Sequence, residues 1–162
     1  MSCINYIATF NDKIKGYVKF HQCKSTEQPK IEFNLSGFKP VQTHAIHVHE
    51  YGDLRDGCKS LGAHLNLTNK EHGTIFIDPI ESHTGDLVNN IESDNNGNVN
   101  FYYYDPRINL FNDVNNSIIG CSVVIHEGQD DYGFGNNAES KITGNAGGRM
   151  ACAVIGKMNP KY

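Results

Sequence analysis

The chain has 162 residues, 38% hydrophobic and 20% charged, so it is about the size of one domain and can bury a core. It has 14 Lys and Arg against 18 Asp and Glu, a net charge of −4. Without a long basic stripe this balance argues against a nucleic-acid partner. No segment approaches the roughly 18 apolar residues of a membrane helix, and no basic leader begins the chain. We expect a single domain over residues 1–162, soluble and cytoplasmic, with no membrane partner.

Apolar and polar residues alternate with a period of two along most of the chain, which predicts β-strands. In one such strand Ile14, Val18 and Phe20 alternate with lysines. The predicted strands, in chain order, are 3–10, 14–20, 31–35, 41–49, 86–92, 98–104, 117–126 and 151–157. No segment shows a helical period over three turns. The pattern therefore predicts the all-β class, as a sandwich or flattened barrel of about eight strands.

Two long segments lack a strand pattern, one from about 50 to 85 and the other from about 127 to 150. Both are rich in Gly, Asn and charged residues. Loops longer than about 15 residues in a compact domain are usually functional. We expect these two loops to carry function.

Five cysteines are spread along the chain, at positions 3, 23, 58, 121 and 152. They are too widely spaced for a small disulfide scaffold, and none forms a C-x-x-C pair. At least one must stay unpaired within the chain. The residues alone predict that Cys3, Cys23 and Cys121 are small buried apolar residues.

The stretch "HAIHVHEYGD" places three histidines close together in one predicted strand. Alternation puts His44 on the same face as Ile46 and Val48, which marks that face as core. We therefore expect His44 to be a hydrogen-bonded interior histidine. His47 and His49 project together from the other face, and such a pair can reach one metal with both rings.

Further histidines add to this pair. In "IIGCSVVIHE" the same alternation turns His126 away from the core face, and three imidazole nitrogens suit copper or zinc. The first long loop supplies three more histidines and a carboxylate: His64, His72, His83 and Asp86. Three His and one Asp make a closed tetrahedral zinc set. Taken singly, each loop histidine is best interpreted as a solvated surface residue. Taken together, six of the eight histidines lie in patterns that suit metal ligands, which favours metal binding.

The chain resembles the copper/zinc superoxide dismutase family of the eukaryotic cytosolic type. The resemblance runs through "HVHEYGD", "GCKSLGAHLN", "EHG", "HTGDL", "VVIHEGQDDYG" and "TGNAGGRMACAVIG", in family order. It implies an eight-stranded Greek-key β-barrel or sandwich of immunoglobulin-like architecture, for which this enzyme is an established example. It also implies dismutation of superoxide to dioxygen and hydrogen peroxide by a copper redox cycle, with a histidine-bridged structural zinc.

The resemblance assigns roles to matching positions. It implies that copper is held by His47, His49, His64 and His126, and zinc by His64, His72, His83 and Asp86. His64 serves both metals and is the implied proton carrier. Asp130, in "QDD", matches a carboxylate that links a copper histidine to a zinc histidine. Arg149, in "GGRMAC", matches the guanidinium that docks the superoxide anion beside copper.

Cys58 and Cys152 match the family's intrasubunit disulfide, which joins the first long loop to the last strand. Two reduced thiols are the alternative in a reducing cytosol. The resemblance also implies a homodimer packed through Tyr51, Gly52, Ile119, Gly120 and the last strand. Lys157 stands where an apolar contact residue is usual in that strand.

The segment "NNAESKITGNAGG" departs from the family pattern. Ala138 stands where the family commonly has an acidic residue, and Ile142 stands where it commonly has a lysine. Lys141 lies one position before that lysine position. Neighbouring side chains of an extended segment point to opposite sides. We therefore expect Lys141 to point away from the substrate channel.

Two other functions compete with the enzyme. A non-catalytic dismutase-like copper-binding, chaperone or decoy module would typically lose a copper histidine or the docking arginine, and this chain keeps them all. A zinc hydrolase needs an open zinc site, whereas four protein ligands fill the implied one.

Overall fold

The computed structural model describes residues 3–78, 80–113 and 117–161. The strands are β1 (Ile4–Asn11), β2 (Lys15–Gln22), β3 (Lys30–Ser36), β4 (Thr43–His49), β5 (Asn90–Glu92), β6 (Asn98–Tyr104), β7 (Ser122–His126) and β8 (Arg149–Lys157). Short helical segments lie in the long loops, namely η1 (Gly57–Leu61), η2 (Thr84–Asp86) and α1 (Ser140–Thr143). The expected all-β class with eight strands is confirmed. No helix within the described ranges is long and apolar enough to cross a membrane.

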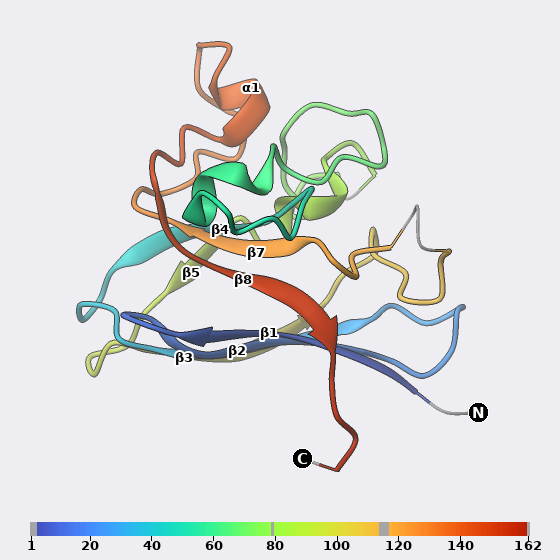
Figure 1. The fold of residues 1–162 in the computed structure, drawn as a ribbon. Coiled ribbons are helices and arrows are strands. Elements are labelled where there is room, and N and C mark those ends of the chain that lie inside the picture. The colour runs from blue at the N-terminus through green and yellow to red at the C-terminus, as the bar shows by residue number, and fades with distance from the viewer. Residues whose placement is uncertain (1–2, 79, 114–116, 162) are drawn as a thin grey trace.

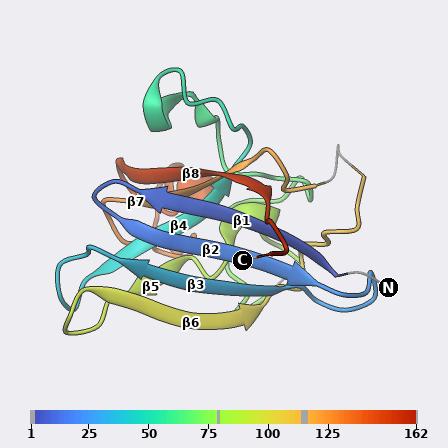
Figure 2. The same ribbon diagram turned by 60° about the horizontal axis from the view of Figure 1, so that its bottom comes forward.

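The eight strands form a nearly closed antiparallel barrel. Their order is β5-β4-β7-β8-β1-β2-β3-β6, so the chain crosses over between strands that are far apart in sequence. Figure 2 shows β1, β2, β3 and β6 side by side on one side of the barrel. In Figure 1 these strands lie at the bottom, and the two long loops gather at the top over β4 and β7.

Large apolar side chains from the inner faces of the strands fill the barrel. Phe20 and Phe33 are fully buried there, and Phe33 stacks on Phe101 with ring centroids 4.7 Å apart. Burying one such side chain contributes about 1.5–3 kcal/mol relative to exposure. This core holds β4 and β7 in place beneath the loops.

Strand β4 is buried on both faces. Ile46 and Val48 belong to the core, as the alternation predicted, and the long loops cover the opposite face. His44 points to the core side, where its Nδ1–H donates to the carbonyl of His126 at 2.9 Å. The expected interior histidine is confirmed.

The expectation for two of the cysteines was wrong. Cys3 and Cys23 form a disulfide at the end of the β1–β2 pair, and Cys3 is exposed. The strand register brings the two together, and the register is not visible in the alternation of a single strand. Cys121 is buried and free, as expected.

Candidate metal centre

The histidine cluster lies between the barrel and the two long loops. His47 and His49 come from β4, and His126 ends the neighbouring strand β7. A bridge between the backbones of His49 and His64 fixes the first loop against β4. One nitrogen from each of these four rings lies within 4.8 Å of the others, and all four residues are buried.

The hydrogen bonds of His49 and His126 fix which ring nitrogen carries the lone pair. Nδ1–H of His49 donates to the carbonyl of Gly62 at 3.0 Å, and Nδ1–H of His126 donates to that of Gly147 at 3.2 Å. The lone pair of each ring is therefore on Nε2. These two Nε2 atoms face each other at 3.3 Å. Two lone pairs at this distance fit a cation between them.

The other two rings each offer a nitrogen without a partner. Nε2–H of His47 donates to Oδ2 of Asp130 at 2.6 Å, which leaves the lone pair on Nδ1. Among the described residues, Nδ1 of His47 and Nε2 of His64 have no hydrogen-bond partner although both are buried. Leaving a buried polar atom unsatisfied costs about 1–3 kcal/mol. A bound metal ion would satisfy both atoms.

The pKa values of these four histidines favour the neutral rings that metals need. Burial lowers the pKa of His49 to about 2 and that of His126 to about 4. Burial also holds the pKa of His47 well below its ordinary value and lowers that of His64. All four rings are therefore uncharged near pH 7, with lone pairs available to a cation.

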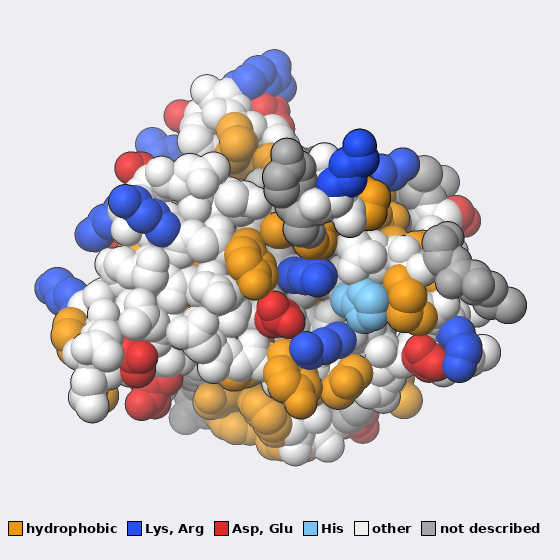
Figure 3. All heavy atoms as spheres, turned by 90° about the horizontal axis from the view of Figure 1, so that it is seen from below, with side chains coloured by type: hydrophobic (Ala, Val, Ile, Leu, Met, Phe, Trp, Pro, Cys, Tyr) orange, Lys and Arg blue, Asp and Glu red, His pale blue; other side chains and the backbone are white. Residues whose placement is uncertain are grey.

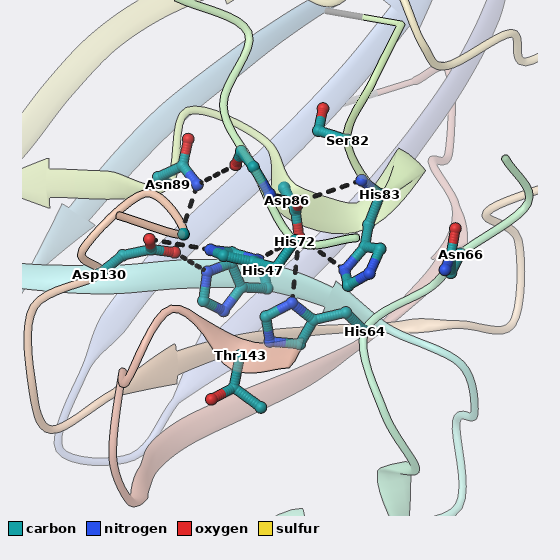
Figure 4. A network of polar contacts seen from close by, with 12 residues as sticks. His47, His64, Asn66, His72, Ser82, His83, Asp86, Asn89, Asp130 and Thr143 are labelled. Carbon is teal, nitrogen blue, oxygen red and sulfur yellow. Dashed lines mark hydrogen bonds and ion pairs between the residues drawn. The ribbon is translucent and has the colours of Figure 1, made fainter. Parts of the chain in front are cut away.

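A second set of ligand atoms surrounds the carboxylate of Asp86 (Figure 4). The Nδ1 atoms of three rings lie 3.0, 2.9 and 3.1 Å from the same oxygen, Oδ1 of Asp86: those of His64, His72 and His83. All four residues are buried. Three buried imidazoles and one buried carboxylate fit a closed tetrahedral zinc site. His64 thus presents Nδ1 to this set and Nε2 to the other.

Asp130 joins the two sets. Its Oδ2 accepts from His47, and its Oδ1 accepts from Nε2–H of His72 at 2.9 Å. Burial lowers the pKa of His72, but its hydrogen bonds to Asp130 and Asp86 outweigh burial and raise the pKa to about 9. Burial would raise the pKa of Asp130, and the bonds from His47 and His72 hold it below its ordinary value instead. The ionised carboxylate orients both rings.

Asn89 and Asn90, which no sequence pattern indicated as functional, hold Asp130. The backbone N–H of Asp130 donates to Oδ1 of Asn90 at 2.8 Å, and Nδ2 of Asn89 donates to Oδ2 of Asp130 at 3.3 Å. The available signal was the Asn pair that closely follows Asp86, the expected zinc ligand.

Arg107 was also missed. Its buried guanidinium pairs with Asp105 at 2.9 Å and donates to the carbonyls of His83 at 3.0 Å and Leu87 at 2.6 Å. It therefore anchors the backbone on both sides of Asp86. The charged pair in "YDPR", directly after an apolar strand, was the signal for it.

One side of the cluster opens to solvent. The residues that line a depression on this side include His49, His64, His126 and Arg149. The guanidinium of Arg149 is fixed, because it donates to the carbonyls of Cys58 at 2.7 Å and Gly62 at 2.5 Å. Cys58 is in turn joined to Cys152 by a disulfide. An anion entering this depression meets a held cation beside three lone-pair nitrogens.

The segment at the rim of this depression is not extended, so the geometric basis of the expectation for Lys141 was wrong. Residues 140–143 form α1. Nζ of Lys141 donates to the carbonyl of Gly133, and Lys141 is not among the residues that line the depression. Ile142 is 53% exposed, and Glu139 and Thr143 lie at the opening.

The comparisons with known proteins agree with this geometry. The family model "Copper/zinc superoxide dismutase" matches residues 14–155. A superoxide dismutase [Cu-Zn] of Paramecium bursaria Chlorella virus 1 is 44% identical over 94% of this chain and 78% of its own length. That of Saccharomyces cerevisiae is 41% identical over 90% of this chain and 92% of its own.

Two further relatives extend the comparison. An extracellular superoxide dismutase [Cu-Zn] of Drosophila melanogaster is 42% identical over 94% of this chain and 81% of its own length. A crystal structure of the clock protein EA4 superposes with a TM-score of 0.86 at 37% identity, covering 98% of this chain and 97% of that one. The expected resemblance is confirmed: this chain belongs to the copper/zinc superoxide dismutase family, whose enzymes use copper and zinc to dismutate superoxide.

Proposed function

We propose that this chain, as a single domain over residues 1–162, dismutates superoxide at the ligand set that borders the depression, which we call the open set. The copper ligands in this proposal are His47, His49, His64 and His126, and the zinc ligands are His64, His72, His83 and Asp86. One observation carries the proposal. His64 presents one ring nitrogen to the buried set around Asp86 and the other to a set that borders the open depression lined by Arg149.

The two ligand sets have different chemical tasks. When bound, copper would supply one-electron redox chemistry, so that one superoxide leaves as dioxygen and a second, with one proton from His64 and one from water, leaves as hydrogen peroxide. Asp86 and the three histidines around it are buried, so this set orients His64 rather than meeting substrate. Asp130 positions His47 and His72 through its two carboxylate oxygens.

Arg149 is proposed to dock the anion. Its bonds to the carbonyls of Cys58 and Gly62 hold the guanidinium at the wall of the depression without neutralising it. A carbonyl carries no full charge, so the cation remains available for charge-assisted hydrogen bonds to superoxide. The disulfide between Cys58 and Cys152 supports this wall.

His64 is proposed to move the proton. Its Nδ1 is engaged by Asp86, which leaves Nε2 as the atom that, whenever it is not bound to copper, can hold a proton and pass it to the departing peroxide. Nε2 must gain and lose a proton while the ring keeps its position. The contact between Nδ1 and Asp86 holds the ring in that position.

The variant His47→Ala tests these roles. It should lose copper and superoxide turnover while zinc stays bound, because His47 belongs to the open set alone. Elemental analysis and a superoxide-consumption assay on the same sample measure both. His21→Ala, measured with the bridge between Cys3 and Cys23 closed, is the control, since His21 lies on β2 outside both sets. A His47→Ala protein with parental turnover would contradict the proposed roles.

A homodimer is proposed through Tyr51, Gly52, Ile119, Gly120 and strand β8. Tyr51 is 57% exposed, and a methyl group at Gly52 would lie 2.5 Å from the carbonyl oxygen of Gly120, so the two segments form one continuous surface. Sedimentation at micromolar concentration should give a dimer, and a monomer would reject this part of the proposal.

A cytoplasmic location is also proposed. The relatives include one protein named as extracellular and one from a virus, so they do not select a compartment. Cell fractionation of the expressed chain is the measurement that tests this prediction.

A further inference from the structure

A second group of metal-ligating side chains lies away from the histidine cluster. Cys3, His21 and Cys23 each offer one ligand atom, and these atoms lie within 4.8 Å of one another. They stand at the ends of β1 and β2, in the sheet that faces away from the long loops (Figure 1). Figure 3 shows the outer face of this sheet, where charged side chains and a histidine lie among apolar ones. None of the three residues has a part in the proposed dismutation.

The register of the two strands explains why these side chains meet. Asn5 of β1 pairs with His21 of β2. Two positions further along, Cys3 lies opposite Cys23, and a step of two keeps side chains on the same face of the sheet. Gln22, between the two β2 residues, is buried on the inner side. Cys3, His21 and Cys23 therefore share the outer, accessible face.

Asn5 sets the tautomer of His21. Nδ1–H of His21 donates to Oδ1 of Asn5 at 2.8 Å, so the lone pair of the ring is on Nε2. This Nε2 lies 3.3 Å from Sγ of Cys23. A ring held through one nitrogen, with its other nitrogen aimed at the remaining ligands, is how proteins orient metal-binding histidines.

In the structure the two sulfurs form a disulfide, which is not the ligand form of cysteine. Two molecules of a low-molecular-weight thiol can reduce this bond. They supply two electrons and two protons, leave as their own disulfide, and yield two Cys thiols. Cys3 is exposed to such a thiol, and the bridge spans 20 residues against 94 for Cys58 and Cys152. A shorter closed loop stabilises less, so this is the bridge expected to open first.

We propose that the reduced form binds a thiophilic metal ion, Zn(II) or Cu(I), through Sγ of Cys3, Sγ of Cys23 and Nε2 of His21. Two thiolates and one imidazole suit both ions, and binding releases the two thiol protons to water. A cavity of about 450 Å³ beside His21 and Cys23 leaves room for a water molecule as a further ligand. Oxidation to the disulfide removes two of the three ligands, so the redox state of the bridge controls the site.

The experiment uses the full chain with copper and zinc already loaded. A phosphine reductant opens the exposed bridge, thiol mapping by mass spectrometry records which cysteines are free, and the desalted protein is titrated anaerobically with Zn(II) alone or Cu(I) alone. Elemental analysis after gel filtration should give one additional ion per chain in the reduced protein and none in the oxidised protein. Thiolate-to-metal absorption on titration with Co(II) reports sulfur ligation independently of activity.

Variants separate this site from other thiols. The double variant Cys3→Ser/Cys23→Ser should lose the additional ion and the thiolate-to-metal absorption. His21→Ala should weaken binding of this ion about 10- to 100-fold. Cys121→Ser, which removes the buried free thiol, should bind as the parent does. The double variant also reports any binding by Cys58 and Cys152 if that bridge opens. An additional ion retained in the double variant while Cys58 and Cys152 remain bridged, or none bound by the reduced parent, would overturn the proposal.

Discussion

Asp130 holds His47 in a single orientation, with Oδ2 of the carboxylate 2.6 Å from Nε2 of the ring. The bond leaves Nδ1 as the only lone-pair atom of His47. Because the other oxygen of Asp130 accepts from His72, one carboxylate sets ring orientation in both metal sets. The geometry of each set therefore depends on a residue that belongs to neither.

Asp130→Asn should weaken metal retention. An amide cannot accept from both rings through two oxygens, so zinc and copper affinity should fall about 10- to 100-fold, the usual effect of losing such a partner. Competition with a chelator, followed by elemental analysis, measures this. Asp131→Asn is the matched control, because Asp131 bonds to Ser140 and Asn145 instead of the histidines. Equal metal retention in the Asp130 and Asp131 variants would remove Asp130 from this role.

Arg149→Ile should lower the rate of superoxide consumption about tenfold, a loss of roughly 1.4 kcal/mol. The fixed cation is lost while the histidines stay in place. Pulse radiolysis measures the rate, and an unchanged rate would exclude docking by Arg149.

Ionic strength should affect capture of the anion. The parent rate should fall as salt rises, because the Debye length is about 10 Å at 0.1 M. Lys141 is engaged by the carbonyl of Gly133, so it does not replace a lysine at position 142. Ile142→Lys should therefore raise the rate at low salt. A variant no faster than the parent there would show that this substitution has no effect on steering.

The bridge between Cys58 and Cys152 should stabilise the fold and support Arg149. It spans 94 residues, and closing such a loop stabilises by roughly 4–5 kcal/mol in the chain-entropy model. Cys152→Ser should lower both the free energy of unfolding and the rate, because Cys58 supplies a carbonyl to Arg149. Calorimetry and pulse radiolysis measure the two effects.

The bridge between Cys3 and Cys23 provides the comparison. It spans 20 residues and lies away from Arg149. Replacing both cysteines by serine should destabilise the fold by only about 3 kcal/mol and leave the rate unchanged. If Cys152→Ser affected stability but not the rate, the proposed support of Arg149 would be wrong.

Cys121 should be unreactive in the native protein. Burial raises the pKa of its thiol to about 11, and the thiolate is the nucleophile. At pH 8 only about one thiol in 10³ is ionised, and this fraction should rise about tenfold per pH unit. Iodoacetamide should label Cys121 slowly in the native protein and quickly after denaturation. Labelling at the same fast rate in both states would show that the thiol is accessible and ionised.

The eight strands and the outward direction of the histidines in β4 and β7 could be predicted because they follow from local alternation. Two strands are shorter than predicted, since only 90–92 of 86–92 and 122–126 of 117–126 are strand. In β4, one period-two pattern placed Ile46 in the core and His47 opposite it, and both positions are confirmed. The disulfide between Cys3 and Cys23 was missed because it depends on how β1 and β2 pair. Arg107 was missed for a related reason, since the carbonyls it binds belong to a loop about 20 residues earlier.

The geometry of α1 shows a further limit. The segment around Lys141 was treated as extended, but it forms a single helical turn that ends at Gly144 in a left-handed conformation. One turn is too short to produce a helical period in the sequence. Lys141 does not line the depression, which agrees with the expected direction, but the reason is the helical turn and the bond to Gly133 rather than alternation.

The most direct test measures metal content and superoxide consumption on one sample of the purified chain. We expect one copper and one zinc per chain, rapid consumption by pulse radiolysis, and loss of consumption when copper alone is removed. Rapid consumption by a copper-free preparation, or none by a chain fully loaded with both metals, would contradict it.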